Sequence, residues 1–199
     1  MSEYVLIIDT SSMTGLCALA QKKGSGWEML SEQYVDAESS HSEILFMSIQ
    51  EVLNNNKIKF SDLGTVVYCA GPGSFTGLRI SYSAVKAFTL ATGIKAVGVS
   101  TLRALMYNLK DAKQKYRAVT IKGSGTDIFA FIEDEEHKVI LAEGSYDKTH
   151  VQEVINGFGK DVAHAEQGKV TALGMLSLLE DHAIDGINYL KASYAEKGR

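Results

Sequence analysis

The most specific stretch of the 199-residue chain reads Gly71-Pro72-Gly73-Ser74-Phe75-Thr76-Gly77-Leu78-Arg79-Ile80. It follows an apolar run at residues 65–70 and opens a segment of helical character at residues 75–92. Glycines allow a tight turn and a close approach of two backbones, and a helix N-terminus offers free N–H groups and the positive end of its dipole. The stretch therefore predicts a strand, a turn and a helix, with Gly71, Gly73 and Ser74 placed where a phosphate could bind.

Three better-known motifs do not fit this turn. No Gly-Lys-Ser/Thr follows it, so it is not a Walker A loop, and its glycines lack the Gly-x-Gly-x-x-Gly spacing of dinucleotide folds. Ser74 is flanked at a distance of two residues by Pro72 and Thr76 rather than by glycines, which excludes a nucleophile elbow. A glycine turn more often serves only as a strand-to-helix connection with positive φ angles, and that structural role stays open beside phosphate binding.

The residues before the turn predict strands joined by hairpins, followed by a helix. Apolar runs separated by polar or glycine-containing turns place the strands at residues 4–9, 15–21 and 27–36. A helix is expected from His41 to about Asn54, with Ser39 or Ser40 as its N-cap. Its buried stripe follows helical spacing and consists of Ile44, Leu45, Ile49, Val52 and Leu53.

The residues after the turn predict two lobes. The first lobe ends with a strand at 94–99 and a helix from Ser100 to Leu109. From Tyr116 a similar pattern starts again, with strands at 117–121, 127–133 and 139–145 and helices at 149–157 and 171–182. The chain is therefore predicted to be an α/β protein with an N-terminal lobe at residues 1–110 and a smaller C-terminal lobe at residues 111–199.

Some small and apolar residues on the first two helices suggest a contact surface. Phe46 and Met47 fall off the buried stripe and are expected on a second face of their helix. The 75–92 helix carries a row of alanines that would let another helix approach closely, although close packing within the lobe explains such a row equally well. The predicted partner interface consists of His41, Phe46, Met47, Ala84, Ala87 and Ala91.

Composition excludes several classes of protein. With 45% apolar residues the chain can bury a substantial core. A net charge of −4 argues against binding nucleic acid without a partner's basic surface. The apolar run at residues 4–8 is too short to span a bilayer, so a cytoplasmic protein with no membrane contact is expected. Cys17 and Cys69 lie in apolar stretches and are expected to be buried, reduced thiols.

Four short motifs can be compared with known families: residues 71–80, Gly-Val-Ser-Thr-Leu at 98–102, Ile-Asp-Thr-Ser at 8–11 and His-Ser-Glu at 41–43. Together they resemble the TsaB family, also called YeaZ, over residues 1–109. Beyond that part the match is thin, although Tyr-Leu-Lys at 189–191 is similar to the family's Tyr-Leu-Arg ending. The resemblance implies two ribonuclease-H-like lobes of the actin, sugar-kinase and Hsp70 ATPase superfamily, with the second lobe reduced.

The same resemblance bears on nucleotide binding. The first hairpin turn, with Asp9, Thr10 and Ser11, is similar to the superfamily's first phosphate motif, where an acid holds magnesium or water. Without the resemblance, Asp-Thr-Ser in a turn is more often local capping. In the matching turn of the second lobe, Lys122 stands where the superfamily has an acid. We therefore expect the chain to have no cofactor of its own and to meet Mg-ATP or ADP only through a partner complex.

The resemblance also bears on catalysis. TsaD, the catalytic relative, has a His-x-x-x-His pair whose imidazoles, one helical turn apart, bind one metal ion. Thr101 and Leu105 occupy the corresponding places here, so no metal site and no catalytic residue is predicted. No His-Glu-x-x-His motif occurs, which leaves the glycoprotease-like label of this branch without support from the residues.

The favoured function is that of a non-catalytic scaffold. The resemblance implies a subunit that binds a TsaD-like transferase and supports threonylcarbamoyl transfer to tRNA adenosine. A TsaE-like ATPase is the further implied partner, tRNA would be met only indirectly, and a homodimer is expected when the chain is alone. The alternatives are a minimal ATPase or kinase that uses Asp9 and the 71–77 turn, an M22-like peptidase, and a free-standing homodimer with an unrelated binding task.

Overall fold

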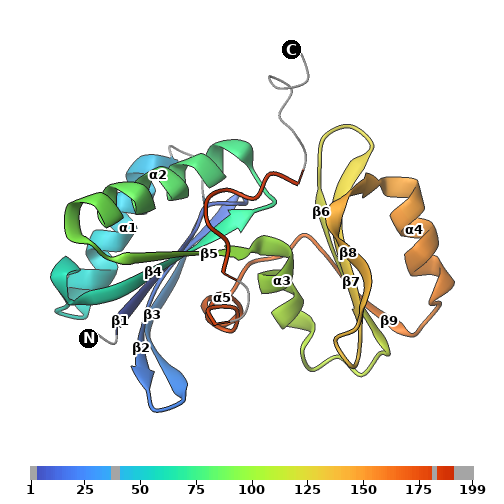
Figure 1. Cartoon of the computed structure of the whole chain (residues 1–199), viewed down its shortest axis with the longest axis horizontal. Helices are drawn as coiled ribbons and strands as arrows, with labels where there is room; N and C mark the ends of the chain where they lie inside the picture. The colour runs from blue at the N-terminus through green and yellow to red at the C-terminus, as the bar shows by residue number, and fades with distance from the viewer. Residues whose placement is uncertain (1–3, 37–40, 181–182, 191–199) are drawn as a thin grey trace.

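The protein has two β-sheets, each with its own helices, joined through a common core (Figure 1). A computed structural model describes residues 4–36, 41–180 and 183–190. No helix in these ranges is long and apolar enough to cross a membrane. The two-lobed α/β fold that the resemblance implied is confirmed.

The first sheet has five strands in the order β3-β2-β1-β4-β5. They are β1 (Tyr4–Asp9), β2 (Thr14–Lys23), β3 (Gly26–Asp36), β4 (Leu63–Gly71) and β5 (Lys95–Ser100). The first three strands are antiparallel hairpins, whereas β4 and β5 run parallel to β1. Parallel neighbours need a crossover, which α1 (His41–Asn55) and α2 (Phe75–Thr92) provide. The carboxyl ends of β1 and β4 therefore lie at the same edge of the sheet.

The second sheet repeats this arrangement with one strand fewer in the described residues. Its order is β8-β7-β6-β9, with β6 (Tyr116–Lys122), β7 (Asp127–Asp134), β8 (Val139–Asp147) and β9 (Val162–Glu166). Hairpins join β6 to β7 and β7 to β8, and α4 (Lys148–Gly157) leads to β9, which runs parallel to β6. This order matches β3-β2-β1-β4 of the first sheet. The second lobe is thus reduced, as expected.

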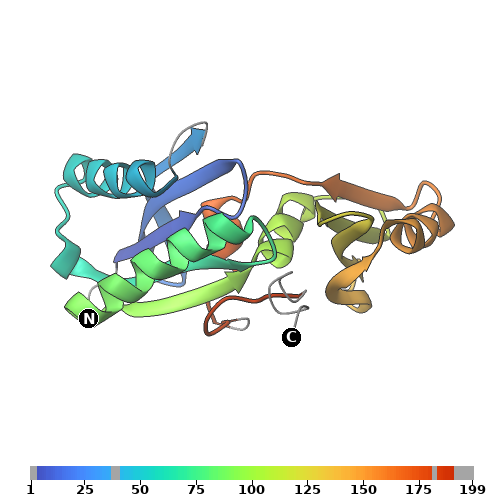
Figure 2. The ribbon, with the colours of Figure 1, turned by 90° about the horizontal axis from the view of Figure 1, so that it is seen from above.

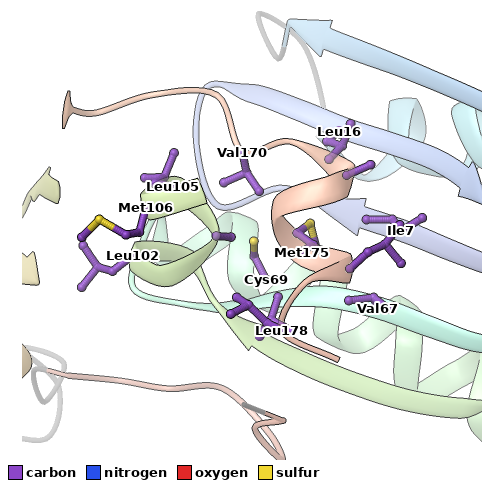
Figure 3. Close-up of a cluster of buried hydrophobic side chains, with 14 of the residues drawn as sticks. Ile7, Leu16, Val67, Cys69, Leu102, Leu105, Met106, Val170, Met175 and Leu178 are labelled. Carbon is purple, nitrogen blue, oxygen red and sulfur yellow. The ribbon is translucent and has the colours of Figure 1, made fainter. Parts of the chain in front are cut away.

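Alternation along β1 divides the first lobe into two apolar layers. Leu6 and Ile8 face the layer under α1 and α2. Val5 and Ile7 face the opposite layer, which contains α3 (Thr101–Met106) and α5 (Ala172–Leu176). Figure 3 shows Ile7, Met175 and Leu102 with other side chains of this second layer, which converge from strands and helices far apart in the sequence.

The second layer also holds the two lobes together. Val119 and Phe131, from the second sheet, belong to the same buried cluster as Ile7 and Leu102 of the first lobe. The view in Figure 2 shows α3 between the two sheets and α4 at the far end of the molecule. Because this core is shared, the orientation of the lobes is fixed by apolar packing as well as by the chain connection.

The C-terminal part of the sequence differs from its prediction. Strand β9 was not predicted, because His164 and Glu166 interrupt its apolar pattern. The helix predicted at 171–182 is only α5, within the described residues, and the helix predicted at 100–109 is α3 followed by the 3-10 turn η2 (Tyr107–Leu109). A second short 3-10 turn, η1 (Phe60–Asp62), precedes β4. The predicted caps Ser39 and Ser40 lie outside the described residues.

The chain returns to the first lobe after β9. The backbones of Gly98 and Ile184 exchange two hydrogen bonds, and the Asn188 N–H donates to the Ala70 carbonyl over 2.7 Å. Val170 and Leu178 join the shared core. The proposed division after residue 110 stays a prediction, but this later segment packs against the first sheet and places Tyr189 and Leu190 between the lobes.

Candidate functional site

Two turns that the sequence singled out lie against each other at the edge of the first sheet. The Ser74 N–H donates to the Ser11 carbonyl over 2.7 Å, and the Thr10 hydroxyl donates to the Gly77 carbonyl over 2.6 Å. The Ser74 hydroxyl accepts the Gly77 N–H at 3.2 Å and caps α2. The first hairpin turn and the glycine turn thus form one hydrogen-bonded seam, because β1 and β4 are parallel neighbours that end together.

The glycines serve this seam in different ways. A Cβ at Gly73 would lie 2.5 Å from the Ser11 carbonyl oxygen, and a Cβ at Gly77 would lie 1.7 Å from that of Thr10. Gly71 has a φ of 120°, in the region that favours glycine. Gly73 does not have a positive φ, so the positive φ angle expected of turn glycines is found at Gly71 and not at Gly73. A glycine is needed at position 73 because the backbone of Ser11, in the first hairpin turn, comes too close for any side chain.

Asp9 is enclosed behind the seam. Its Oδ1 accepts the Ser11 N–H at 2.7 Å, and its side chain is 1% exposed. Burial raises the pKa of the Asp9 carboxyl above its ordinary value, although hydrogen bonds from Ser11 act in the opposite direction. Its other oxygen, Oδ2, is buried without a hydrogen-bond partner in the described part of the chain. This carboxyl is therefore placed as a local cap and not as an accessible metal ligand.

A cleft of about 750 Å³ lies between the two lobes, on the other side of the seam. The first lobe contributes Ser11, Gly73 and Ser74 to its wall, whereas Asp9, Thr10 and Gly71 are not part of the lining. The second lobe contributes the end of β6 and the facing part of β7. A volume of this size is typical of sites for small organic molecules. The structure thus brings only half of the predicted phosphate-proximal residues to the cleft.

The cleft lining is apolar with a cationic rim. Its apolar walls are formed by Met13, Phe75, Leu78, Leu105, Ile121, Phe129, Val170 and Leu190. Lys122 and Arg79 supply positive charge, and no Asp or Glu is found among the described residues that line the cleft. Arg79 lies with its Cζ 3.8 Å from the centre of the Phe75 ring, and its Nε donates to the Tyr189 hydroxyl over 3.4 Å.

This lining does not fit a magnesium nucleotide held as the superfamily resemblance implies. Such a site needs carboxylates facing the phosphates, because Mg²⁺ prefers oxygen ligands and bridges them to the nucleotide. Asp9 is sealed behind the seam, and Lys122 is exposed at the matching place in the second lobe. A cation at that place would repel a metal ion. The described residues that line the cleft thus offer no accessible acid of the kind that the ATPase or kinase alternative requires.

The places that correspond to the metal-binding histidines of TsaD lie in the core. Leu105 is 2% exposed, and Thr101 is 3% exposed and follows Ser100, whose hydroxyl caps α3 by accepting the Arg103 N–H. The Thr101 hydroxyl is buried without a hydrogen-bond partner in the described residues. One thiol lies nearby on β4, that of Cys69, and burial raises its pKa well above the ordinary value. No group of three or more His, Cys, Asp or Glu side chains in the described ranges could hold a metal.

A separate surface on α1 and α2 carries the residues predicted for a partner. Phe46 is 50% and Met47 69% exposed, as the helical spacing predicted. Phe46 touches Phe88 of α2 edge to face, with ring centroids 5.9 Å apart, so the helices are neighbours (Figure 1). We call the exposed set the helix platform, and it consists of Phe46, Met47, Ala87, Leu90 and Ala91.

Two of the predicted interface residues are not included in this set. Ala84 is 4% exposed and belongs to the core under α2, so close packing within the lobe explains it. His41 begins α1, but its side chain lies outside the described residues. The prediction from spacing missed Leu90, which is 86% exposed and lies one helical turn from Ala87. Its position three residues after Ala87 and next to Ala91 was the available signal.

Cleft residues from the second lobe and the C-terminal segment were also missed. Phe129 and Ile121 lie on β7 and β6, and Leu190 follows the return to the first sheet. Strand patterning predicted only that such residues are apolar. Their meeting with Leu105 and Leu78 depends on how the lobes pack, which no local pattern records.

Comparison with known protein families gives one long match. The family model described as TsaD, tRNA N6-adenosine threonylcarbamoyltransferase, matches residues 35–171, more than half of the chain. A protein of Buchnera aphidicola subsp. Schizaphis graminum named tRNA threonylcarbamoyladenosine biosynthesis protein TsaB is 36% identical over 117 residues, which are 59% of this chain and 52% of that protein.

A second relative and a solved structure extend the comparison. A tRNA N6-adenosine threonylcarbamoyltransferase of Lactobacillus acidophilus is 32% identical over 162 residues, with 75% of this chain and 46% of that protein covered. The chain spans about half the length of these curated relatives. A crystal structure from Pseudomonas aeruginosa, described as similar to peptidase YEAZ, has a TM-score of 0.75 at 17% identity. It covers 96% of this chain and 100% of its own, so it shows a common fold.

Proposed function

We propose, from the premise that this chain belongs to the TsaB/YeaZ family within the wider group matched by the TsaD model, that it takes part in threonylcarbamoyladenosine formation on tRNA as a non-catalytic subunit. In this proposal it binds a TsaD-type transferase, which performs the chemistry. The similarity to named TsaB and transferase proteins supports the pathway, and the two lobes of the fold support the family.

The observation that carries the non-catalytic part is the chemistry at Thr101 and Leu105. Metal-bound histidines need free ring nitrogens that face one ion. Here a leucine is packed in the shared core, and a threonine hydroxyl is buried beside it. Neither side chain is a ligand for a borderline cation such as zinc or iron. In this proposal, transfer chemistry that depends on the metal-binding pair of histidines therefore comes from another chain.

The helix platform supports the partner part of the proposal. Large apolar side chains are exposed on both α1 and α2, which are neighbouring helices, and exposed apolar patches often mark interfaces. Small residues at Ala87 and Ala91 allow a second helix to approach closely. We propose that a TsaD-type protein packs helices on this platform, and that a second copy of the chain uses the same surface when TsaD is absent, because two-fold symmetry brings identical patches together.

Several further features belong to the same proposal. A TsaE-like ATPase would join the complex, Mg-ATP or ADP would be bound there and not by this chain alone, and tRNA would be met only through the partners. The acidic net charge of −4 supports the indirect contact with tRNA. A cytoplasmic location follows from the proposed substrate.

The experiment is co-purification with the host's TsaD-type protein. Phe46→Glu together with Met47→Lys places charges in the platform, and we expect it to weaken both the heterodimer and the homodimer at least tenfold. Val139→Glu together with Ile140→Lys is the matched control, because these β8 residues are 47% and 40% exposed on the other lobe. Unchanged affinities in the folded platform variant would show that the partner docks elsewhere. Threonylcarbamoyl transfer by this chain alone would refute the non-catalytic role.

A further inference from the structure

We propose that the cleft between the lobes binds a small organic anion with an apolar body, and that it does so without a metal ion. The proposal goes beyond the scaffold function, since it concerns a ligand of this chain alone. It rests on three properties of the cleft: its volume of about 750 Å³, its apolar walls and its cationic rim.

The walls define the body of the ligand. Leu78 and Leu105 come from the first lobe, Ile121 and Phe129 from the second, and Leu190 from the returning segment. Three separate parts of the chain thus present apolar side chains to one space. A ring system or a short acyl chain would cover the parts of Phe75, Phe129 and Leu190 that are exposed to water, which favours binding in proportion to the apolar area that is buried. A strongly polar ligand such as a free sugar would find few hydrogen-bond partners on these walls.

The rim defines the charge of the ligand. Lys122 is exposed at the end of β6, directly after the wall residue Ile121, and no ion pair of its ammonium is found in the described part of the chain. Arg79 adds a second positive charge above the Phe75 ring. No carboxylate is among the described lining residues, so the lining itself carries positive charge. An anionic group on the ligand is therefore attracted, and a metal cation is repelled.

The buried polar atoms of the floor are consistent with a ligand that has few polar groups. The Ser11 and Thr101 hydroxyls belong to residues that line the cleft, but the two oxygen atoms themselves are buried. Because neither oxygen is accessible from the cleft, the anionic group of the ligand would bind at the rim. This arrangement differs from a phosphate chain, which would need several donors along its length.

The test uses two fluorescent probes that differ by one group. 8-Anilinonaphthalene-1-sulfonate carries a sulfonate, and N-phenyl-1-naphthylamine is the same ring system without it. The measurements are made at about 0.15 M salt, where electrostatic screening is physiological. We expect each wild-type chain to bind one molecule of the sulfonate probe, and to bind it more tightly than the neutral probe. Lys122→Gln should weaken the sulfonate probe about fivefold, the upper range for a partly exposed ion pair, and change the neutral probe less than about twofold. Phe129→Ala should weaken both probes roughly fivefold to tenfold.

The controls separate this site from adventitious dye binding. Lys138→Gln removes an exposed lysine in the β7–β8 turn, outside the cleft lining, and should change neither affinity. Thermal unfolding confirms that each variant is folded, and Lys122→Gln remains informative if Phe129→Ala is unstable. The proposal is overturned by equal effects of Lys122→Gln and Lys138→Gln, by more than one dye per chain, or by no binding. Displacement of the dye by ATP only when Mg²⁺ is present would also overturn it, because that result assigns the cleft to a metal nucleotide.

Discussion

Replacing Gly73 by alanine should destabilise the protein strongly, because the added Cβ would meet the backbone of the first hairpin turn. That atom would lie 2.5 Å from the carbonyl oxygen and 2.7 Å from the Cβ of Ser11. Neither atom belongs to the end of a flexible side chain. The seam must therefore open, and the 2.7 Å hydrogen bond from the Ser74 N–H to the Ser11 carbonyl would be lost or stretched.

The magnitude follows from two contributions. Forcing an extra carbon into a closely packed place costs about 1–3 kcal/mol, and a lost backbone hydrogen bond about 1 kcal/mol. Gly73→Ala should thus lower the free energy of unfolding by about 2–4 kcal/mol, and Gly73→Val by more. Ser74→Ala removes only the α2 cap, which is worth about 1 kcal/mol. For a chain of this length, a change of about 1 kcal/mol corresponds to roughly 2–4 °C in Tm.

The assay is thermal and urea unfolding of these variants, followed by complex formation with a TsaD-type protein. Gly157→Ala is the matched control, because a Cβ at this α4 residue would meet nothing within 4 Å. We expect it to be neutral or slightly stabilising. A Gly73→Ala protein whose Tm lies within about 2 °C of the wild type would refute the reasoning, since the seam would then tolerate the side chain.

Two further predictions concern buried and half-buried charges. Burial in the folded protein raises the pKa of Asp9 above its value in the unfolded chain. The contribution of Asp9 to the free energy of unfolding is therefore most favourable below the unfolded-state pKa, and it is lost as the pH rises through the folded-state pKa. Asp9→Asn should therefore stabilise the protein relative to wild type more at about pH 8 than at about pH 4, and each pH unit between the folded and unfolded pKa values corresponds to about 1.4 kcal/mol. Tm against pH measures this difference, and a constant difference between the two proteins would contradict the prediction. Glu143 of β8 accepts hydrogen bonds from Ser100 and Arg103 across the lobes, and Glu143→Gln should cost about 1–3 kcal/mol in urea unfolding. The exposed Glu136→Gln is its control and should stay within about 0.5 kcal/mol, so equal effects would show that the contact does not join the lobes.

The sequence alone predicted what depends on neighbours along the chain. Apolar runs between turn residues located the strands of the first sheet, and helical spacing located α1 and α2 and the exposure of Phe46 and Met47. These features follow from which face of one element is apolar, so a short window of residues contains the information. The motifs around residues 71–80 also indicated the family, and with it the two-lobed fold.

The sequence could not show what depends on distances through space. The sequence predicted that Asp9 and Gly73 lie near a phosphate. In the structure the seam encloses Asp9, and Gly73 lies against the backbone of Ser11. The same limit applies to β9, whose edge position and polar residues leave little pattern to detect. A residue's role here is set by the segment that packs against it, and that segment can be far away in the sequence.

The cleft is the clearest case of a feature that only the tertiary structure decided. Lys122 was visible in the sequence as a departure from an acid, but its place on the rim of an apolar cleft requires both lobes and the returning segment with Leu190. The shared core fixes that geometry, because Val119 and Phe131 pack in the same cluster as Ile7. Local propensity specifies each element, whereas the burial of apolar surface between elements determines which of their side chains face a common space.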